Sequence, residues 1–319
     1  MRTATERIGY FGKIPARSDF IKMAYDAPVM GMLDEWLAQV MSALPANPRW
    51  KLDYDAMPPV SFVFVGPARH YAVAGHLVSS HDQSGRRFPF LMMRTVDVPD
   101  PVGFVSRSPL ALAPLWTYYD AMAPRIVASS DPGPLLQGIA DANVVLGDAQ
   151  PELASFLASG TVSSLSALLG CQVERLVLAL GLVLQPVMHS QPAAVHKSLV
   201  LPLPEDATAR CAVAAFWLEL AAPFLRRGGF DLALFMTRQD GKPVLVVGFC
   251  SAVAEALRAI IDPLEAADQQ VGFADTSWVD EQLGLDVDVR ALASYLDQPQ
   301  LPLRLARELF LQTFIGAAS

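Results

Sequence analysis

The sequence is poor in cysteine, and its few cysteines are badly placed for pairing. Only three occur in 319 residues, Cys171, Cys211 and Cys250. An odd count at such wide spacing excludes a disulfide framework, and the lack of a Cys-x-x-Cys pair excludes a zinc ribbon. We expect all three to be small buried apolar residues in a reducing compartment.

Charge is also scarce, and positive charge most of all. Charged residues make up 18% of the chain, and 24 Lys and Arg face 32 Asp and Glu, for a net charge of -8. The densest basic features are the pairs Arg86-Arg87 and Arg226-Arg227. A nucleic-acid partner needs a basic face that displaces counterions from phosphates, so we expect no nucleic acid and no anionic membrane as partners.

Long apolar runs are missing as well. The longest strongly apolar run, Leu176 to Leu184, is much shorter than the roughly 20 residues that a membrane span needs. The N-terminus lacks the uninterrupted apolar segment of a signal peptide. We therefore expect no membrane insertion and a cytoplasmic protein.

Apolar residues, by contrast, are abundant. They form 52% of the chain, and the mean hydropathy is +0.32, which is typical of an ordered protein with a large core. A length near the upper limit for one core favours two units. We predict an N-terminal domain over 1–184, a linker or long loop over 185–196, and a C-terminal α/β domain over 197–319.

Hydrophobic periodicity predicts the elements of the first domain. A strand over Arg7–Ile14 is followed by a loop over 16–28 and by an amphipathic helix over Val29–Leu44. Three β-rich runs then predict an antiparallel meander. The runs are Val60–Val65, Tyr71–Ser79 and Phe88–Val96, and helices are predicted after them over 109–128, 133–141 and 150–169.

The second domain repeats the mixture of strands and helices. We predict strands over 198–203, 230–236 and 243–249, the last two joined at Asp240-Gly241, and helices over 207–224, 252–261, 287–296 and 302–314. The fold class is therefore α/β, a layered mixed and largely antiparallel sheet flanked by helices, with a second smaller α/β unit at the C-terminus.

The loop between the second and third strands of the meander carries opposite charges across a tight turn. Asp82 and Arg86 can pair bidentately, and Gly85 can adopt positive φ. We interpret the segment as a structural hairpin with an internal salt bridge, although an exposed Asp or Arg would instead serve recognition. Pro89 indicates an edge or the start of a strand. The full pattern is Ser80-x-Asp82-x-x-Gly85-Arg86-x-Phe88-Pro89.

A second charged segment follows the first predicted strand. Its Gly12-Lys13 pair lacks the rest of a phosphate-binding loop, because Ile14 stands where Ser or Thr is required. We therefore expect no nucleotide and no other cofactor. The segment reads Gly9-Tyr10-Phe11-Gly12-Lys13-Ile14-Pro15-Ala16-Arg17-Ser18-Asp19-Phe20.

Together the two segments resemble the TagF (ImpM) family of type VI secretion-associated proteins. The first matches a signature Gly-aromatic-aromatic-Gly-Lys-Leu-Pro-x-Arg-Gly-Asp-Phe, with Ile14 for Leu and Ser18 for Gly. The second matches Ser-x-Asp-x-x-Gly-Arg-x-Phe-Pro. The predicted helix that carries Trp36 resembles the family's Trp-containing helix. The resemblance covers about Ile8 to Val96 and is weaker beyond.

The resemblance implies a regulatory protein without an active site. Family members repress type VI secretion after translation and are thought to engage an FHA-domain scaffold. We expect this chain to be a non-catalytic regulator with the same partner. If the two charged segments meet, they form an ion-pair network, and the candidate binding residues are Lys13, Arg17, Asp19, Ser80, Asp82, Gly85, Arg86 and Phe88.

Two alternatives stay open. The first is an enzyme acting on a phosphate ester or small ligand through Asp82, Arg86 and a histidine, which requires these side chains to converge. However, His76 and His81 are not spaced as a helical metal pair, and no Gly-x-Ser-x-Gly elbow occurs. The second alternative is a structural accessory subunit of the secretion apparatus.

Overall fold

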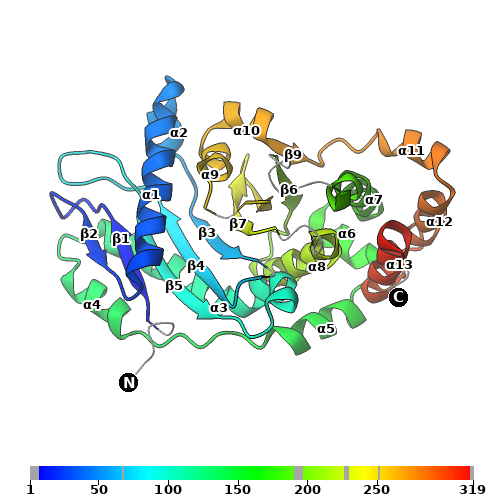
Figure 1. Ribbon diagram of the computed structural model, residues 1–319, viewed down its shortest axis with the longest axis horizontal. Coiled ribbons are helices and arrows are strands. Elements are labelled where there is room, and N and C mark those ends of the chain that lie inside the picture. The colour runs from blue at the N-terminus through cyan, green and yellow to red at the C-terminus, as the bar shows by residue number, and fades with distance from the viewer. Residues whose placement is uncertain (1–6, 67, 190–196, 226–229, 251, 317–319) are drawn as a thin grey trace.

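One twisted sheet organises the whole chain (Figure 1). The computed structural model describes residues 7–66, 68–189, 197–225, 230–250 and 252–316. Within them the sheet has nine strands in the order β2-β1-β5-β4-β3-β7-β8-β6-β9. Every neighbouring pair is antiparallel except β6 and β9, and the two ends of the sheet do not meet. Helices cover both faces, so the fold is a layered α/β fold.

The first five strands form one half of the sheet. The predicted meander is confirmed as β3 (Val60–Val65), β4 (Tyr71–Val78) and β5 (Phe90–Asp97). Strand β1 (Gly9–Gly12) pairs with β5, and β2 (Ile21–Met23) pairs with β1 to form one edge. The predicted loop over 16–28 is thus wrong at 21–23, because three residues are too few to show an alternating pattern.

Strands from the second half of the chain continue the same sheet. Strand β3 pairs with β7 (Leu232–Gln239), with Phe62 opposite Phe235. Beyond it lie β8 (Lys242–Gly248), β6 (Ser198–Pro202) and the short β9 (Gln270–Gly272). The division into domains at 184 and 197 stays a prediction, and the sheet runs across it without interruption.

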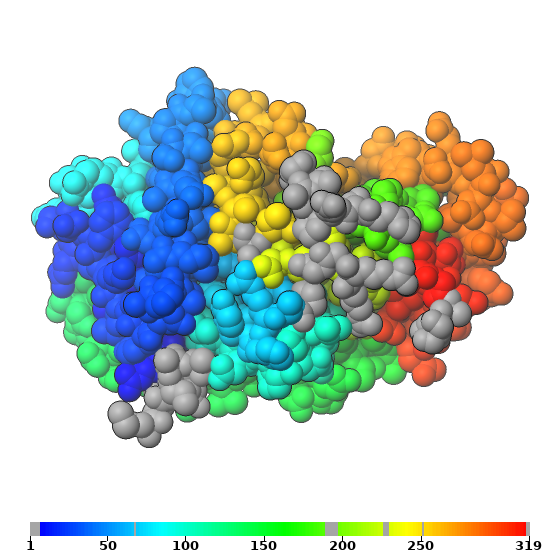
Figure 2. Space-filling model, viewed as in Figure 1, coloured from blue at the N-terminus to red at the C-terminus, as the bar shows by residue number. Residues whose placement is uncertain are grey.

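Helix α1 (Ala27–Ala43) lies across one face of the sheet (Figures 1 and 2). Asp26 caps it, since its Oδ1 accepts from Val29 N at 3.1 Å, and Pro28 stands in the first turn. Its Trp36 is buried among Phe62, Phe64 and Phe235 and donates from Nε1 to Val253 O at 3.1 Å. Helix α1 therefore contacts strands from both halves of the sheet.

Helix α3 (Pro101–Ala128) and helix α8 (Ala207–Leu225) cover the opposite face. Alternate residues of each strand point to the two faces, as the two separate apolar clusters show. Helix α3 begins eight residues before the predicted start at Pro109, because Asp100 caps it and Pro101 occupies its first turn. Pro109, Pro114 and Pro124 lie inside it.

The remaining helices are short. Near α1 lie the 3-10 turn η2 (Leu44–Ala46), α2 (Trp50–Asp55), α9 (Ala254–Ile261) and α10 (Pro263–Gln269). Helix α4 (Gly133–Asp141) follows α3, and the others gather at the far end of the molecule around α8. These are α5 (Ala149–Ser159), α6 (Val162–Leu169), α7 (Val173–Leu184), α11 (Val279–Leu285), α12 (Val287–Leu296) and α13 (Leu303–Ile315).

Two apolar segments of the described chain are long enough to be compared with a membrane span. Helix α8 passes by length and composition, but 61% of its apolar window is buried inside the protein. The pair Val162–Leu169 and Val173–Met188 passes only if joined, and it is bent by 93°. Helix α8 and the bent pair pack together at the same end of the molecule.

Two further expectations need correction or completion. Cys171 is exposed and Cys211 and Cys250 are only partly buried, so the predicted burial of the cysteines is wrong. Cys171 follows Gly170, the left-handed residue that ends α6, and so lies in a turn between two helices. Of the predicted linker, 185–189 forms the 3-10 turn η3 and 190–196 lies outside the described residues.

A substitution at Gly12 tests how tightly the end of β1 packs against the start of β5. Its φ is +129°, and an added Cβ would lie 1.9 Å from Pro89 O, so Gly12→Ala should cost about 2–5 kcal/mol of unfolding free energy or prevent folding. Gly31→Ala, on the open side of α1, is the control and should stabilise by about 0.5–1 kcal/mol. Urea denaturation measures both, and equal changes in the two variants would contradict this account.

Candidate functional site

The two signature segments lie side by side at one end of the sheet (Figures 1 and 2). The N-terminal loop, Lys13–Phe20, joins β1 to β2, and the hairpin loop, Ser79–Pro89, joins β4 to β5. Because β1 runs antiparallel to β5, with Gly12 opposite Phe90, the end of β1 and the start of β5 meet at the same edge. The pairing of the strands therefore brings the loops together.

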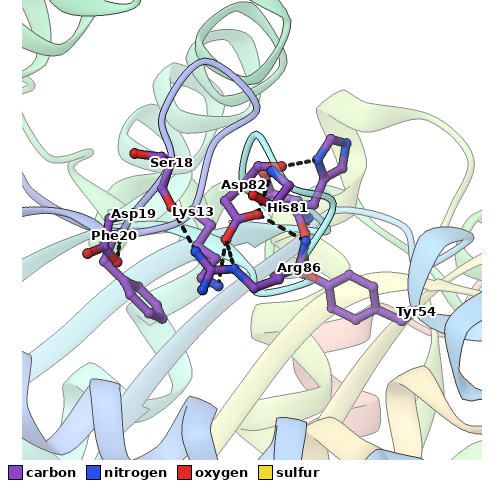
Figure 3. A network of polar contacts seen from close by, with 10 residues as sticks. Lys13, Ser18, Asp19, Phe20, Tyr54, His81, Asp82 and Arg86 are labelled. Atoms are coloured by element: carbon purple, nitrogen blue, oxygen red, sulfur yellow. Dashed lines mark hydrogen bonds and ion pairs between the residues drawn. The ribbon is translucent and has the colours of Figure 1, made fainter.

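The carboxylate of Asp82 is the centre of the contact between the loops (Figure 3). It is fully buried, and it accepts four hydrogen bonds. Its Oδ2 accepts from Lys13 Nζ at 2.9 Å and from Arg86 Nε at 2.6 Å, and its Oδ1 accepts from Ser84 N at 2.9 Å and Arg86 N at 3.0 Å. A carboxylate has about four lone-pair sites, so all of them are used.

The same donors determine the ionisation of Asp82. Burial alone would raise the pKa of its carboxyl, but the hydrogen bonds from Lys13, Arg86 and the Ser84 amide outweigh burial and hold this pKa well below its usual range. The group is a paired anion at neutral pH. A buried carboxylate without these partners would be strongly unfavourable, so its position depends on both loops.

Backbone contacts fix the two loops further. Gln83 N donates to Arg17 O at 2.9 Å, and Arg86 Nη2 donates to Ser18 O at 2.8 Å. Gly85 has a φ of +76°, which confirms the predicted left-handed residue in the turn. The hairpin loop is thus held from inside by Asp82 and from the side by the N-terminal loop.

Tyr54 of α2 anchors the start of the hairpin loop. Its hydroxyl donates to Ser80 O and accepts from Ser80 N, each at 3.0 Å. The Ser80 hydroxyl itself is buried and has no hydrogen-bond partner among the described residues. Ser80 therefore contributes mainly through its backbone.

Aromatic rings cover the side of the loops that faces α1. Phe20 stacks on Phe11 with ring centroids 5.3 Å apart, and its edge contact with Phe88 measures 4.8 Å. The ammonium of Lys13 lies 4.8 Å from the centre of the Phe20 ring. Phe11 and Phe88 are buried, whereas 44% of Phe20 is exposed.

The predicted site residues thus fall into an inner and an outer set. The ion-pair network expected between the segments is confirmed for the inner set, Lys13, Asp82 and Arg86, and Arg86 is also 62% exposed. The side chains of Arg17 and Asp19 are exposed and make only local hydrogen bonds, Arg17 to Ala16 O and Asp19 from Phe20 N. That these residues bind a partner stays a prediction. Sequence reasoning treated Phe20 only as part of the motif and missed its exposed ring.

The residues named for the enzyme alternative converge only in part. Asp82 and Arg86 are paired, but His81 directs Nδ1 to the Asp82 carbonyl at 2.8 Å and not to the carboxylate. A cavity of about 480 Å³ beside the hairpin loop is lined by Asp55, Ser79, Ser80, His81, Gly85, Arg87 and Val127. Its guanidinium, from Arg87, is already paired with Asp55 through bonds of 2.8 and 2.6 Å.

A Ser–His–Asp set elsewhere in the sheet was not foreseen from the sequence. Ser61 Oγ lies 3.0 Å from His76 Nδ1, and His76 Nε2 lies 3.9 Å from Asp120 Oδ1. Ser61 and His76 are direct neighbours across the β3–β4 ladder. The carboxylate is beyond hydrogen-bond reach and mostly exposed, so it cannot orient the imidazole as a catalytic triad requires. We interpret this set as a cross-strand pair.

Comparison with known proteins identifies the part of the chain that carries both loops. A family model described as the TagF N-terminal domain, type VI secretion system-associated, matches residues 9–139. Residues 9–139 belong to the TagF N-terminal domain family. This TagF domain includes β1 to β5, α1 to α4 and the whole Asp82 network. This part of the chain therefore matches a domain that is described as type VI secretion system-associated.

Other comparisons add little. Among solved structures, the crystal structure of PA0076 from Pseudomonas aeruginosa PAO1 is similar at 14% sequence identity, with a TM-score of 0.45 over 80% of this chain and 94% of that chain. No curated protein matches the chain in sequence.

Lys13 tests whether the Asp82 network holds the TagF domain together. Lys13→Met keeps most of the side chain's volume but removes one of the two cations at a fully buried carboxylate, so it should lower the free energy of unfolding by about 2–3 kcal/mol. The same change at exposed Lys22 is the control and should cost less than about 0.5 kcal/mol. Chemical denaturation gives both values. Equal losses would show that the network is not stabilising.

His76 predicts a pH dependence of stability. Burial, which outweighs the nearby Asp120 carboxylate, lowers the pKa of His76 to about 4 from 6.5. Between these values the unfolded chain takes up the proton and the folded chain does not, so stability should fall as the pH drops from 6.5 towards 4, by about 3 kcal/mol in all. His76→Gln should remove this component in denaturation curves measured at several pH values. His70→Gln, at an exposed histidine, should retain it.

Proposed function

We propose that this protein is a cytoplasmic, non-catalytic regulator of the type VI secretion system. It represses secretion after translation by binding another protein, the FHA-domain scaffold of the system. The TagF domain supports the association with this secretion system. The partner and the direction of regulation follow from the resemblance of the two signature segments to those of the family.

The saturated carboxylate of Asp82 is the observation that carries this proposal. A general base must have a lone pair free for a substrate proton, and all four sites of Asp82 accept from Lys13, Ser84 or Arg86. The most distinctive charged residues of the domain are thus used to brace two loops. Such a rigid surface suits recognition of a protein.

The arrangement beside the hairpin loop also favours binding over catalysis. Arg87 is paired with Asp55, and the imidazole of His81 is engaged with a carbonyl oxygen. A phosphate-ester substrate would need an unpaired cation or a bound metal at this place. Among the described residues, no group of three or more His, Cys, Asp or Glu side chains is placed to hold a metal ion.

Binding and secretion assays test the proposal together. The purified chain should bind the FHA-domain scaffold with a dissociation constant below about 10 µM, measured by calorimetry. Deleting the gene should raise secretion by the type VI system, and overproducing the chain should lower it, because a repressor acts in proportion to its amount.

The controls separate the alternatives. A structural subunit would copurify with the apparatus, and its deletion would abolish secretion. An enzyme would turn over a substrate in the absence of the scaffold. Failure to bind the scaffold at tens of micromolar, with a correctly folded chain by circular dichroism, would count against the proposal.

A further inference from the structure

The exposed ring of Phe20 lies at the outer end of a three-ring stack. Phe11 supports its face and Phe88 its edge, and both of these rings are buried in the core beside α1. An exposed aromatic ring is costly to leave in water, but a ring fixed in this way loses little side-chain entropy when a partner covers it. Rigid aromatic anchors of this kind dominate the binding energy of many protein interfaces.

Three exposed cations lie on the two loops and on β2, beside the segment that carries this ring, in a chain whose net charge is -8. Arg17 and Lys22 are exposed, and neither makes an ion pair with the described residues. Arg86 is 62% exposed and leaves Nη1 without a hydrogen-bond partner among the described residues. The N-terminal loop contains one acidic residue, Asp19, and its side chain is exposed. The local charge is therefore opposite to that of the whole molecule.

These five residues, Arg17, Asp19, Phe20, Lys22 and Arg86, are connected in space and are here named the Phe20 surface. Arg86 donates to Ser18 O, between Arg17 and Asp19. Lys22 lies over the Phe11 ring, 5.7 Å from its centre, and Phe11 carries Phe20 on its face. Figure 3 shows Phe20, Asp19 and Arg86 on the loops that surround the Asp82 carboxylate.

We propose that the Phe20 surface is the docking site for an acidic segment of the partner protein that also carries an apolar side chain. The apolar side chain covers Phe20, and the carboxylates of the segment pair with Arg17, Lys22 and Arg86. The proposal rests on the proposed binding function and adds its place and its chemistry. Planar guanidinium groups suit this role because they can hold a carboxylate by two parallel bonds.

Other occupants fit the observations less well. A second copy of this chain in a symmetric contact would bring the same cations against one another, which is repulsive. Nucleic acid would need more phosphate contacts than three exposed cations give, against the repulsion of an acidic protein. Leu285 and Val287 are more exposed than Phe20 but lie at the α11–α12 end, where nothing indicates what would cover them.

Matched variants of the full chain test the proposal. Arg17→Glu with Lys22→Glu reverses the local charge, and Phe20→Ser removes the anchor, so each should weaken binding of the FHA-domain scaffold at least about tenfold. Lys242→Glu with Arg304→Glu makes the same change of net charge, and Leu285→Ser removes an exposed apolar side chain elsewhere. These controls should stay within about twofold of the wild type.

Two further probes keep the test independent of the scaffold. One is a synthetic eight-residue peptide of alternating glutamate and leucine, titrated by fluorescence anisotropy at low and moderate salt, because charge-dependent binding weakens as salt rises. The other is a suspension of vesicles that contain phosphatidylserine. The proposal expects the peptide to bind the wild type and the controls and to lose affinity for the Phe20-surface variants.

Each result has a definite meaning. Scaffold binding that the Phe20-surface variants leave unchanged would overturn this inference and leave the proposed function intact. Absence of scaffold binding would count against the proposed function, while selective loss of the peptide by the variants would still support the surface. If the wild type binds neither the scaffold nor the peptide, the proposed docking site for an acidic protein segment is overturned. It is also overturned if the wild type binds only the vesicles and the Phe20-surface variants lose that binding.

Discussion

The arrangement of the TagF domain depends on how one buried carboxylate is neutralised. Asp82 comes from the hairpin loop and Lys13 from the end of β1, so their ion pair joins segments that are 69 residues apart in the chain. Removing a carboxylate from water is expensive, and only the geometry that supplies both cations and two amides makes it tolerable. The β1–β5 ladder and this network therefore reinforce each other, since the ladder aligns the loops and the network prevents them from separating. The ends of the antiparallel strands β1 and β5, which would otherwise carry two independent loops, become one rigid structure.

The rest of the sheet is tied to this domain through a shared core. Phe62 of β3 lies opposite Phe235 of β7, and Trp36 packs on both while it donates to the carbonyl of Val253. Cutting the chain after the TagF domain would expose the backbone of β3 as a new edge and uncover these rings. The C-terminal strands therefore protect a face that the TagF domain cannot cover by itself, whatever further role they have.

Much of the architecture was predictable because its patterns are local. Val60–Val65, Gly133–Asp141 and Val287–Leu296 were placed correctly by periodicity and by flanking Pro, Gly and Asp. Strand β2 and helix α2 were missed because three and six residues contain too little pattern, and their stability comes from tertiary contacts with β1 and with Ser80. The salt bridge of the hairpin was readable as a charge pair at spacing four, but nothing local showed that Lys13 would complete it. That the strands of both halves form one sheet was likewise invisible, because pairing of β3 with β7 joins segments far apart in sequence.

Some signature residues are buried and others are exposed, and this difference decides what the effect of a mutation at each of them means. Lys13 and Asp82 are buried, so replacing either one alters the shape of both loops, and the proposed activity would be lost whether or not they touch a partner. The side chains of Arg17 and Lys22 are exposed and form no ion pair with the described residues, and none of the four hydrogen bonds to the Asp82 carboxylate comes from Arg17, Phe20 or Lys22. The Phe20 ring does pack on Phe11 and Phe88, so a Phe20 variant needs its stability measured beside its binding. Arg86 belongs to both sets, because Nε holds Asp82 and Nη2 donates to Ser18 O, while 62% of the side chain is exposed. Recognition must therefore be assigned from the outer residues, at unchanged stability, and the inner residues report on the rigidity that makes such recognition favourable.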